Sequence, residues 1–157
     1  MKKITGVLIV LAFLIASCEN EKNEIPVPEG YKLIWNDEFD YNGLPDAEKW
    51  SYDTVGNDYG WGNNELQFYT SHDKDNAFVD GEHLHIKAIK EDKGDHDYTS
   101  ARLITKNKGD WKYARIETRA KLPSGRGIWP AIWMLPTDWE YGGWPESGEI
   151  DIMEHVG

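Results

Sequence analysis

The end of the chain carries three acids whose spacing could support acid–base chemistry. Glu149, Asp151 and Glu154 lie in the segment Gly-Glu-Ile-Asp-Ile-Met-Glu-His. In a strand, the first two acids share one face, because side chains alternate with a period of two. Glu154 joins that face only if the strand accommodates one extra residue, as in a β-bulge. The sequence therefore predicts a bulged strand with an acidic face, and with an apolar face of Ile150 and Ile152 that packs into the core.

Three acids on one strand face admit three interpretations. From the acids alone, a solvated edge strand ranks first. Glycoside hydrolysis ranks second, because it uses one carboxyl group as nucleophile or base and another as proton donor. A metal site that includes His155 ranks third, since a residue adjacent to Glu154 points to the opposite face of a strand.

Tryptophans just upstream of the acids change this ranking. Four of them lie within sixteen residues: Trp129, Trp133, Trp139 and Trp144. Indole rings stack on the apolar C–H faces of sugars, so tryptophans beside paired acids are typical of a polysaccharide cleft. Core packing is the better interpretation for some of them, because residues 128–135 are apolar on both faces.

The elements that position these residues read as strands. Residues 83–88, 113–121 and 149–152 alternate apolar with polar side chains, and turn-forming Gly, Pro, Asn and Asp clusters separate such segments. No segment after residue 30 shows a sustained helical stripe. The pattern predicts an all-β fold, an antiparallel sandwich or barrel.

The predicted strand 113–121 has a charged face. Arg115, Glu117 and Arg119 would stand in a row on one side of it. Taken alone, this row favours a solvated face, which is the usual position of a charged alternation. The floor of a polar groove is the alternative.

Length and composition narrow the class of protein. The chain has 157 residues, which suits one domain, and a net charge of −11. An acidic protein repels phosphate backbones, so we expect no nucleic-acid partner. The single cysteine excludes an internal disulfide framework and a cysteine-clustered zinc site.

The N-terminal residues have the pattern of a targeting signal. Lys2 and Lys3 precede the apolar run Val7 to Ala16, whose ten residues suit a signal peptide and fall short of the about 20 that a membrane-spanning helix needs. The run ends in Leu-Ile-Ala-Ser-Cys, which resembles a bacterial lipoprotein signal with Cys18 as the lipidated residue. We therefore expect a signal peptide at 1–17, and a lipidated cysteine and flexible tether at 18–30. The expected location is the outer membrane or cell surface, with the periplasmic side as the alternative.

Several ordered motifs after residue 30 resemble glycoside hydrolase family 16, the laminarinase-like β-glucanases. Glu149 to Glu154 matches the Glu-x-Asp-x-x-Glu motif of the laminarinase branch. Four further segments look like family strands or cleft-edge segments: Trp35-Asn36-Asp37-Glu38-Phe39, Trp61-Gly62-Asn63-Asn64-Glu65-Leu66-Gln67, Tyr113 to Pro123 and Gly127 to Pro136. The resemblance covers residues 31–157.

The resemblance implies a fold and a set of roles. The fold would be a concanavalin-like β-jelly roll, an antiparallel β-sandwich with a concave cleft. Glu149 would be the nucleophile, Glu154 the general acid/base and Asp151 the residue that tunes the nucleophile. Sugar subsites would be lined by Trp144, Trp133, Trp129, Asn64, Glu117 and Arg119, so the resemblance favours a groove floor for the last two.

The sequence therefore predicts a retaining endo-β-glucanase that acts on β-1,3-glucan or mixed-linkage β-glucan such as laminarin, and that is a monomer. The resemblance implies no required cofactor; many family members bind a structural calcium, whose ligands the sequence does not define here. Family domains extend beyond the length of this chain, so we expect a sandwich that is incomplete on its C-terminal side, with open edges. The alternatives are a non-catalytic surface glycan-binding lipoprotein and an inactive truncated remnant.

Overall fold

The computed structural model describes residues 25–157, and the chain divides into two compact units, Met1–Ile34 and Trp35–Gly157. In the described part of the first unit, the backbone N–H of Tyr31 donates to the carbonyl of Pro28 at 3.1 Å, and Gly30 takes the left-handed conformation that this turn requires (φ +82°). The predicted signal peptide and Cys18 lie outside the described residues. No helix among residues 25–157 is long and apolar enough to cross a membrane.

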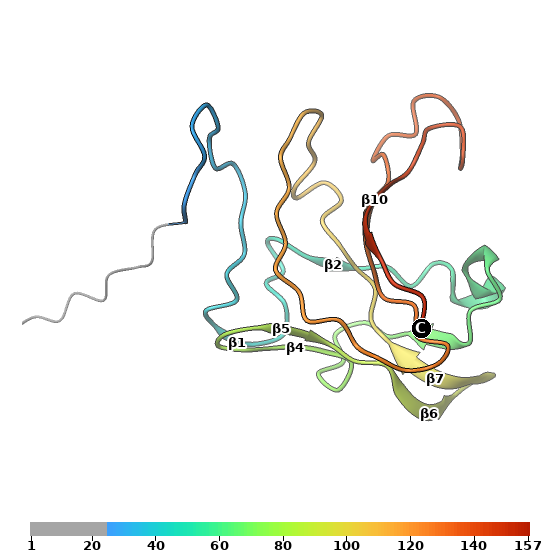
Figure 1. The fold of residues 1–157 in the computed structure, drawn as a ribbon. Coiled ribbons are helices and arrows are strands. Elements are labelled where there is room, and N and C mark those ends of the chain that lie inside the picture. Colours follow the sequence, from blue (N-terminus) through green and yellow to red (C-terminus); the bar gives the residue numbers. More distant parts are fainter. Residues whose placement is uncertain (1–24) are drawn as a thin grey trace, which may run out of the picture. The chain divides into compact units, whose positions relative to one another are not determined.

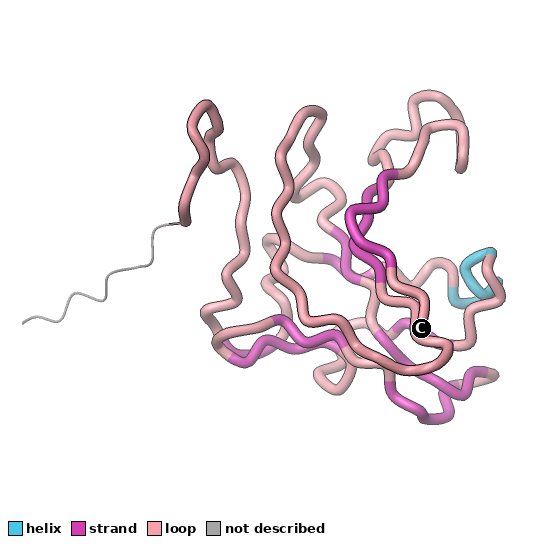
Figure 2. The backbone as a smooth tube through the Cα atoms, viewed as in Figure 1, coloured by secondary structure: helices cyan, strands magenta, loops and turns pink. Residues whose placement is uncertain are grey.

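The second unit consists of short strands joined by long loops (Figures 1 and 2). Its only helical segment among these residues is the 3₁₀ helix η1, Asn57–Gly62. The strands are β1 Asn42–Gly43, β2 Ser51–Tyr52, β3 Gln67–Tyr69, β4 Ala77–Asp80, β5 Leu84–Ile86, β6 Ile89–Lys93, β7 His96–Ser100, β8 Leu103–Ile104, β9 Ala131–Met134 and β10 Ile150–Glu154. The all-β prediction is confirmed.

The strands form four small sheets with the orders β1-β4-β5, β3-β7-β6, β2-β8 and β10-β9. Neighbouring strands are antiparallel, as predicted, except β3 and β7, which run parallel. A parallel pair needs a crossover connection, because a tight hairpin cannot join parallel strands. Here the connection from β3 to β7 runs through β4, β5 and β6.

The most buried residues between these strands include a polar network. Ala77, Val79 and Ala101 are the buried apolar side chains, while Asn76 and Thr99 are completely buried. The Asn76 amide donates to Thr99 Oγ1 at 3.0 Å and accepts from Thr70 Oγ1 at 2.7 Å. Because β3, β7 and the start of β4 meet at these side chains, the network fixes their relative register.

A second buried centre is the carboxylate of Asp37, whose side chain is 2% exposed. It accepts hydrogen bonds from Trp50 Nε1 at 2.8 Å and Tyr41 Oη at 3.2 Å, and it pairs with Lys49 Nζ at 3.3 Å. Edge-to-face contacts of Trp35 with Trp50 and Trp111, with ring centroids 5.5 and 5.6 Å apart, pack beside it. Residues 35–39, expected to resemble a family strand, are therefore held by the side-chain contacts of Trp35 and Asp37 and form no strand.

The predicted strand 113–121 is the clearest sequence-based error. No strand lies between β8 and β9 in the described structure. A strand needs a neighbour that exchanges backbone hydrogen bonds with it, and none of the strand pairings within residues 25–157 includes this segment. Its side chains are almost all exposed.

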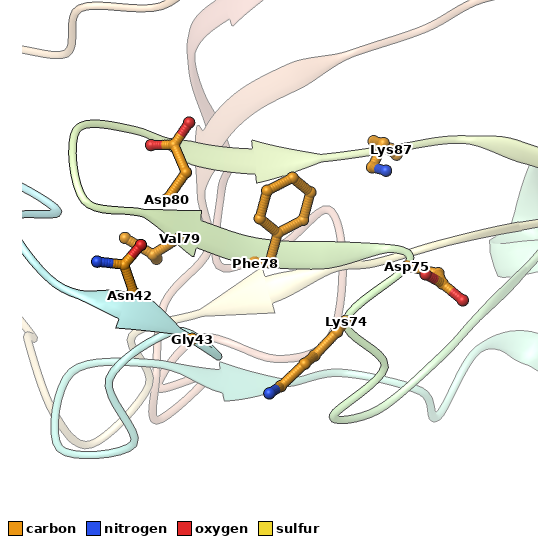
Figure 3. A pocket seen from close by; sticks show the side chains of 8 residues that line it. All are labelled: Asn42, Gly43, Lys74, Asp75, Phe78, Val79, Asp80 and Lys87. Carbon is orange, nitrogen blue, oxygen red and sulfur yellow. The ribbon is translucent and has the colours of Figure 1, made fainter.

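The larger of two described pockets lies on the sheet β1-β4-β5 and is open, with a volume of about 460 Å³ (Figure 3). Its lining is Asn42, Gly43, Lys74, Asp75, Phe78, Val79, Asp80 and Lys87. None of these residues belongs to β9 or β10, so this pocket is separate from the acid-bearing strand.

Candidate active site

The three acids lie on the hairpin of β9 and β10. Asp151 is the Cα partner of Trp133, and Met153 is the partner of Ile132. Two steps along β10 therefore match one step along β9, which leaves Ile152 as the extra residue of a β-bulge. The predicted bulge is confirmed.

The bulge assigns side chains to faces. Glu154 is the partner of Ala131, so it lies on the same face as Asp151 and Trp133. Glu149 directly precedes β10 and is two residues from Asp151, which places it on this face as well. Trp129 also belongs to this face, because it is two residues before Ala131. We call this surface the acid face; its members are Trp129, Ala131, Trp133, Glu149, Asp151 and Glu154.

Glu149 is held from the loop that precedes β10. Trp144 Nε1 donates to Glu149 Oε2 at 3.0 Å. Turns of the same loop order this contact: the N–H of Gly148 donates to the carbonyl of Pro145 at 3.0 Å, and the N–H of Tyr141 donates to Ser147 Oγ at 3.1 Å. The indole therefore projects from a structured loop.

Glu154 is held from the other end of the hairpin. Trp129 Nε1 donates to Glu154 Oε1 at 2.9 Å. The backbone pairing of the hairpin continues past β10, since the N–H of His155 donates to the carbonyl of Pro130 at 3.2 Å and that of Gly157 to the carbonyl of Ile128 at 3.0 Å. Trp129 lies between these two bonds, so its backbone is fixed against the end of the acid-bearing strand.

Arg102 contributes to this region, and sequence reasoning missed it. Its guanidinium carbon lies 4.6 Å from the ring centroid of Trp133 and 4.2 Å from that of Trp61 in η1. Arg102 Nε also pairs with Asp53 at 3.4 Å. A cation between two tryptophans links the acid face to η1, and a lone arginine between two short strands gives no periodic signal that predicts this.

The structure does not bring every predicted site residue to the acid face. Glu117 Oε1 accepts from Arg115 Nε at 2.7 Å, and among residues 25–157 no hydrogen bond joins Glu117, Arg119 or Asn64 to the acids. The predicted row on 113–121 is absent because that segment forms no strand. Asn64 follows η1 in an exposed left-handed conformation (φ +54°).

The back of β10 differs from the prediction that it packs into a core. Ile150 is 63% exposed and Ile152 40% exposed. Both line an open groove of about 310 Å³ with Met134, Trp111, Lys112, Ala114 and Ile116. The apolar face has the predicted composition, but among the described residues no further layer covers it.

Within residues 25–157, no group of three or more His, Cys, Asp or Glu side chains is arranged to hold a metal ion. The metal interpretation of the acids, with His155 as a ligand, therefore gains no support. A structural calcium site stays a prediction without assigned ligands.

The fold and site define a β-sheet protein whose β9–β10 hairpin carries three acids beside indole rings. Residues 62–157 match the family described as the XgeA-like, catalytic GH16 domain. The chain belongs to glycoside hydrolase family 16.

Known proteins are similar over most of this chain. A beta-glucanase from Rhodothermus marinus is 59% identical over 129 residues, which are 81% of this chain and 44% of that protein. A glucan endo-1,3-beta-glucosidase from Cryptopygus antarcticus is 46% identical over 130 residues, 80% of this chain and 46% of that protein. The X-ray structure of the laminarinase from Rhodothermus marinus superposes with a TM-score of 0.76 at 58% identity, over 80% of this chain and 50% of that one. The chain thus spans about half the length or less of these relatives.

Proposed function

We propose that this protein is a retaining endo-β-glucanase that cleaves β-1,3-glucan or mixed β-1,3-1,4-glucan such as laminarin. The observation that carries the proposal is the acid face, where a one-residue bulge brings Glu154 onto the side of Glu149 and Asp151. Relatives named as a beta-glucanase and a glucan endo-1,3-beta-glucosidase support the substrate class.

In the proposed first step, a carboxylate oxygen of Glu149 attacks the anomeric carbon of a bound glucose unit. The bond between that carbon and the glycosidic oxygen breaks, and the oxygen keeps the electron pair. Glu154 supplies the proton that this oxygen takes up, so the leaving sugar departs as an alcohol. Asp151, between the two, orients the nucleophile.

In the second step, Glu154 is a carboxylate and acts as the base. It removes a proton from a water molecule, whose oxygen attacks the anomeric carbon and releases Glu149 from the covalent glycosyl ester. Two inversions at the same carbon retain the β configuration.

Trp133, Trp129 and Trp144 present ring surface beside the acids, with Trp129 51% and Trp144 68% exposed. Exposed indole faces stack on the C–H faces of glucose rings, and we assign these three residues to sugar binding. Arg102 holds the Trp133 ring from the η1 side.

The test is release of reducing ends from laminarin by the full chain. Wild type should generate new reducing ends, whereas Glu149→Gln should release none while it still binds laminarin in affinity electrophoresis. Normal turnover by Glu149→Gln would reject the assigned role of Glu149. Binding by wild type without new reducing ends would favour a glycan-binding protein.

We also propose that Cys18 carries a lipid that anchors the domain to the outer membrane or cell surface. The apolar run that ends at the only cysteine supports this. Cys18→Ser should move the chain from the membrane fraction to the soluble fraction, and an unchanged distribution would reject the anchor.

A further inference from the structure

We infer that Trp144 and Trp129 are positioning residues, which hold the carboxylates of Glu149 and Glu154 through their indole N–H groups as well as offering ring surface to sugars. The inference rests on the proposed function for its catalytic consequence. We call the two residues the indole clamp.

The two indoles make matching contacts with the two glutamates. Trp144 Nε1 bonds one oxygen of Glu149 at 3.0 Å, and Trp129 Nε1 bonds one oxygen of Glu154 at 2.9 Å. Both distances are ordinary for an N–H donor and a carboxylate. Within residues 25–157, no hydrogen bond engages the second oxygen of either carboxyl group, so Glu149 Oε1 remains for attack and Glu154 Oε2 for the proton.

The two indoles come from different segments of the chain. Trp144 belongs to the loop before β10, and Trp129 belongs to the segment before β9. The two indoles therefore contact the acid face at its opposite ends. Asp151, in the middle, is the Cα partner of Trp133 across the ladder. The two carboxylates that make or break bonds in the proposed mechanism are therefore the two that receive an indole donor.

The Glu149 and Glu154 side chains need a contact from another residue to hold them in one conformation. Glutamate side chains have three rotatable bonds, and both clamped residues are exposed. Freezing such side chains costs conformational entropy, which a hydrogen bond from an ordered element offsets. An indole N–H donates in the plane of the ring, so the ring faces remain available to a sugar.

The strength of each hydrogen bond should change with the charge of the carboxyl group that accepts it. When Glu154 has given its proton to the leaving group, it becomes an anion, and the bond from Trp129 becomes charge-assisted and stronger. When Glu149 forms the glycosyl ester, it loses its charge, and the bond from Trp144 weakens. Trp129 therefore favours the products of the first step, whereas Trp144 orients the nucleophile before it.

Phenylalanine variants separate the donor from the ring. Trp144→Phe keeps an aromatic face and removes the N–H. It should lower kcat on laminarin about tenfold with little change in KM, because a Glu149 carboxylate without this constraint is less often aligned for attack. The same loss should appear with a dinitrophenyl β-glucoside. Trp129→Phe should lower kcat similarly on laminarin but much less on the dinitrophenyl substrate, because that leaving group needs little protonation.

A merely structural or stacking role predicts a different outcome. It would raise KM, or slow both substrates equally in both variants. Unchanged kcat in Trp144→Phe, or identical substrate dependence in the two variants, would overturn the clamp.

A second measurement tests the clamp without turnover. In ¹H–¹⁵N spectra of the full chain, the indole resonances of Trp144 and Trp129 are assigned from their loss in the phenylalanine variants. Glu149→Ala should move the Trp144 resonance upfield and leave Trp129 in place, and Glu154→Ala should do the reverse. If neither resonance moves, the clamp is wrong; if wild type releases no reducing ends while the resonances respond reciprocally, the clamp stands and the proposed activity fails.

Discussion

At the scale of single residues, the acid face assigns a separate environment to each carboxyl group. Glu149 receives an indole N–H from the loop before β10, and Glu154 receives one from the segment before β9. Asp151 is the Cα partner of Trp133. Three carboxyl groups on one strand therefore have different neighbours. Different neighbours are what allow carboxyl groups in one site to perform different steps.

Glu154→Ala tests the division of roles between the acids. The variant should lose nearly all turnover of laminarin, because the leaving sugar needs a proton. It should retain part of its turnover of a dinitrophenyl β-glucoside, whose leaving group departs as an anion, and added azide should restore rate. Loss of both activities together, in a variant whose thermal unfolding matches wild type, would contradict the acid/base assignment.

The residues that sequence could predict are those on the periodic strand. Alternation along 149–152 placed Glu149 with Asp151, and the spacing to Glu154 required the bulge that the structure contains. Arg102 was out of reach, because its position depends on Trp61 and Trp133, which come from separate parts of the chain. The hydrogen bonds of Trp129 and Trp144 depend on loop geometry, which no pattern of residue types encodes.

At the scale of elements, the ladder between β9 and β10 aligns the acids, and loops orient them. The predicted strand 113–121 is absent. Alternating side chains show which face a strand would bury, whereas backbone pairing with a neighbour decides whether the strand forms. The assignment of Glu117 and Arg119 to a groove floor stays a prediction. The β5 strand within 83–88 formed because β4 lies beside it.

The buried network at Asn76 is expected to stabilise β3, β4 and β7. Asn76→Ala removes the partner of Thr70 and of Thr99 and leaves a small cavity, so it should lower the free energy of unfolding by about 2 kcal/mol or more. Urea unfolding monitored by tryptophan fluorescence measures the change. Asn63→Ala, at an exposed position, is the matched control and should stay within about 0.5 kcal/mol of wild type; equal effects would show that the network contributes nothing.

The β4–β5 hairpin should respond to acid. A hydrogen bond from His85 at 2.7 Å, and backbone N–H groups of His83 and Glu82, lower the pKa of Asp80 to about 2 from an ordinary value of 3.8. A depressed pKa means that these contacts stabilise the fold fully above the ordinary value and lose this effect as the pH falls toward 2.

The Tm of Asp80→Asn should therefore lie below that of wild type at pH 5 to 7. The two values should converge between about pH 4 and pH 2. A difference that stays constant across that window would contradict the assignment of the contact to the ionised carboxylate.

At the scale of the whole molecule, two surfaces of one hairpin have opposite character. The acid face carries three carboxyl groups and exposed indoles, and the opposite side carries Ile150 and Ile152 beside an open apolar groove. Composition indicated an acidic protein with many tryptophans. Alternation indicated an all-β fold, which the structure has. The exposure of Ile150 and Ile152 was not predictable from sequence. Alternation shows which side chains a packing layer would cover, but not whether residues 25–157 supply that layer.

The net charge of −11 suits a neutral polysaccharide better than an anionic one. The family membership of residues 62–157 and the similarity to glucan-cleaving relatives agree with this. We therefore expect the acid face to perform covalent, retaining hydrolysis with Glu149 as nucleophile.

The most direct test is to trap the covalent intermediate. The full chain is incubated with a dinitrophenyl 2-fluoro-β-laminaribioside, which forms the glycosyl ester faster than water can hydrolyse it, and the modified residue is mapped by mass spectrometry. We predict one added glycosyl group on Glu149, absent in Glu149→Gln. A label on Asp151 or Glu154, or laminarin hydrolysis without any covalent adduct, would contradict the account.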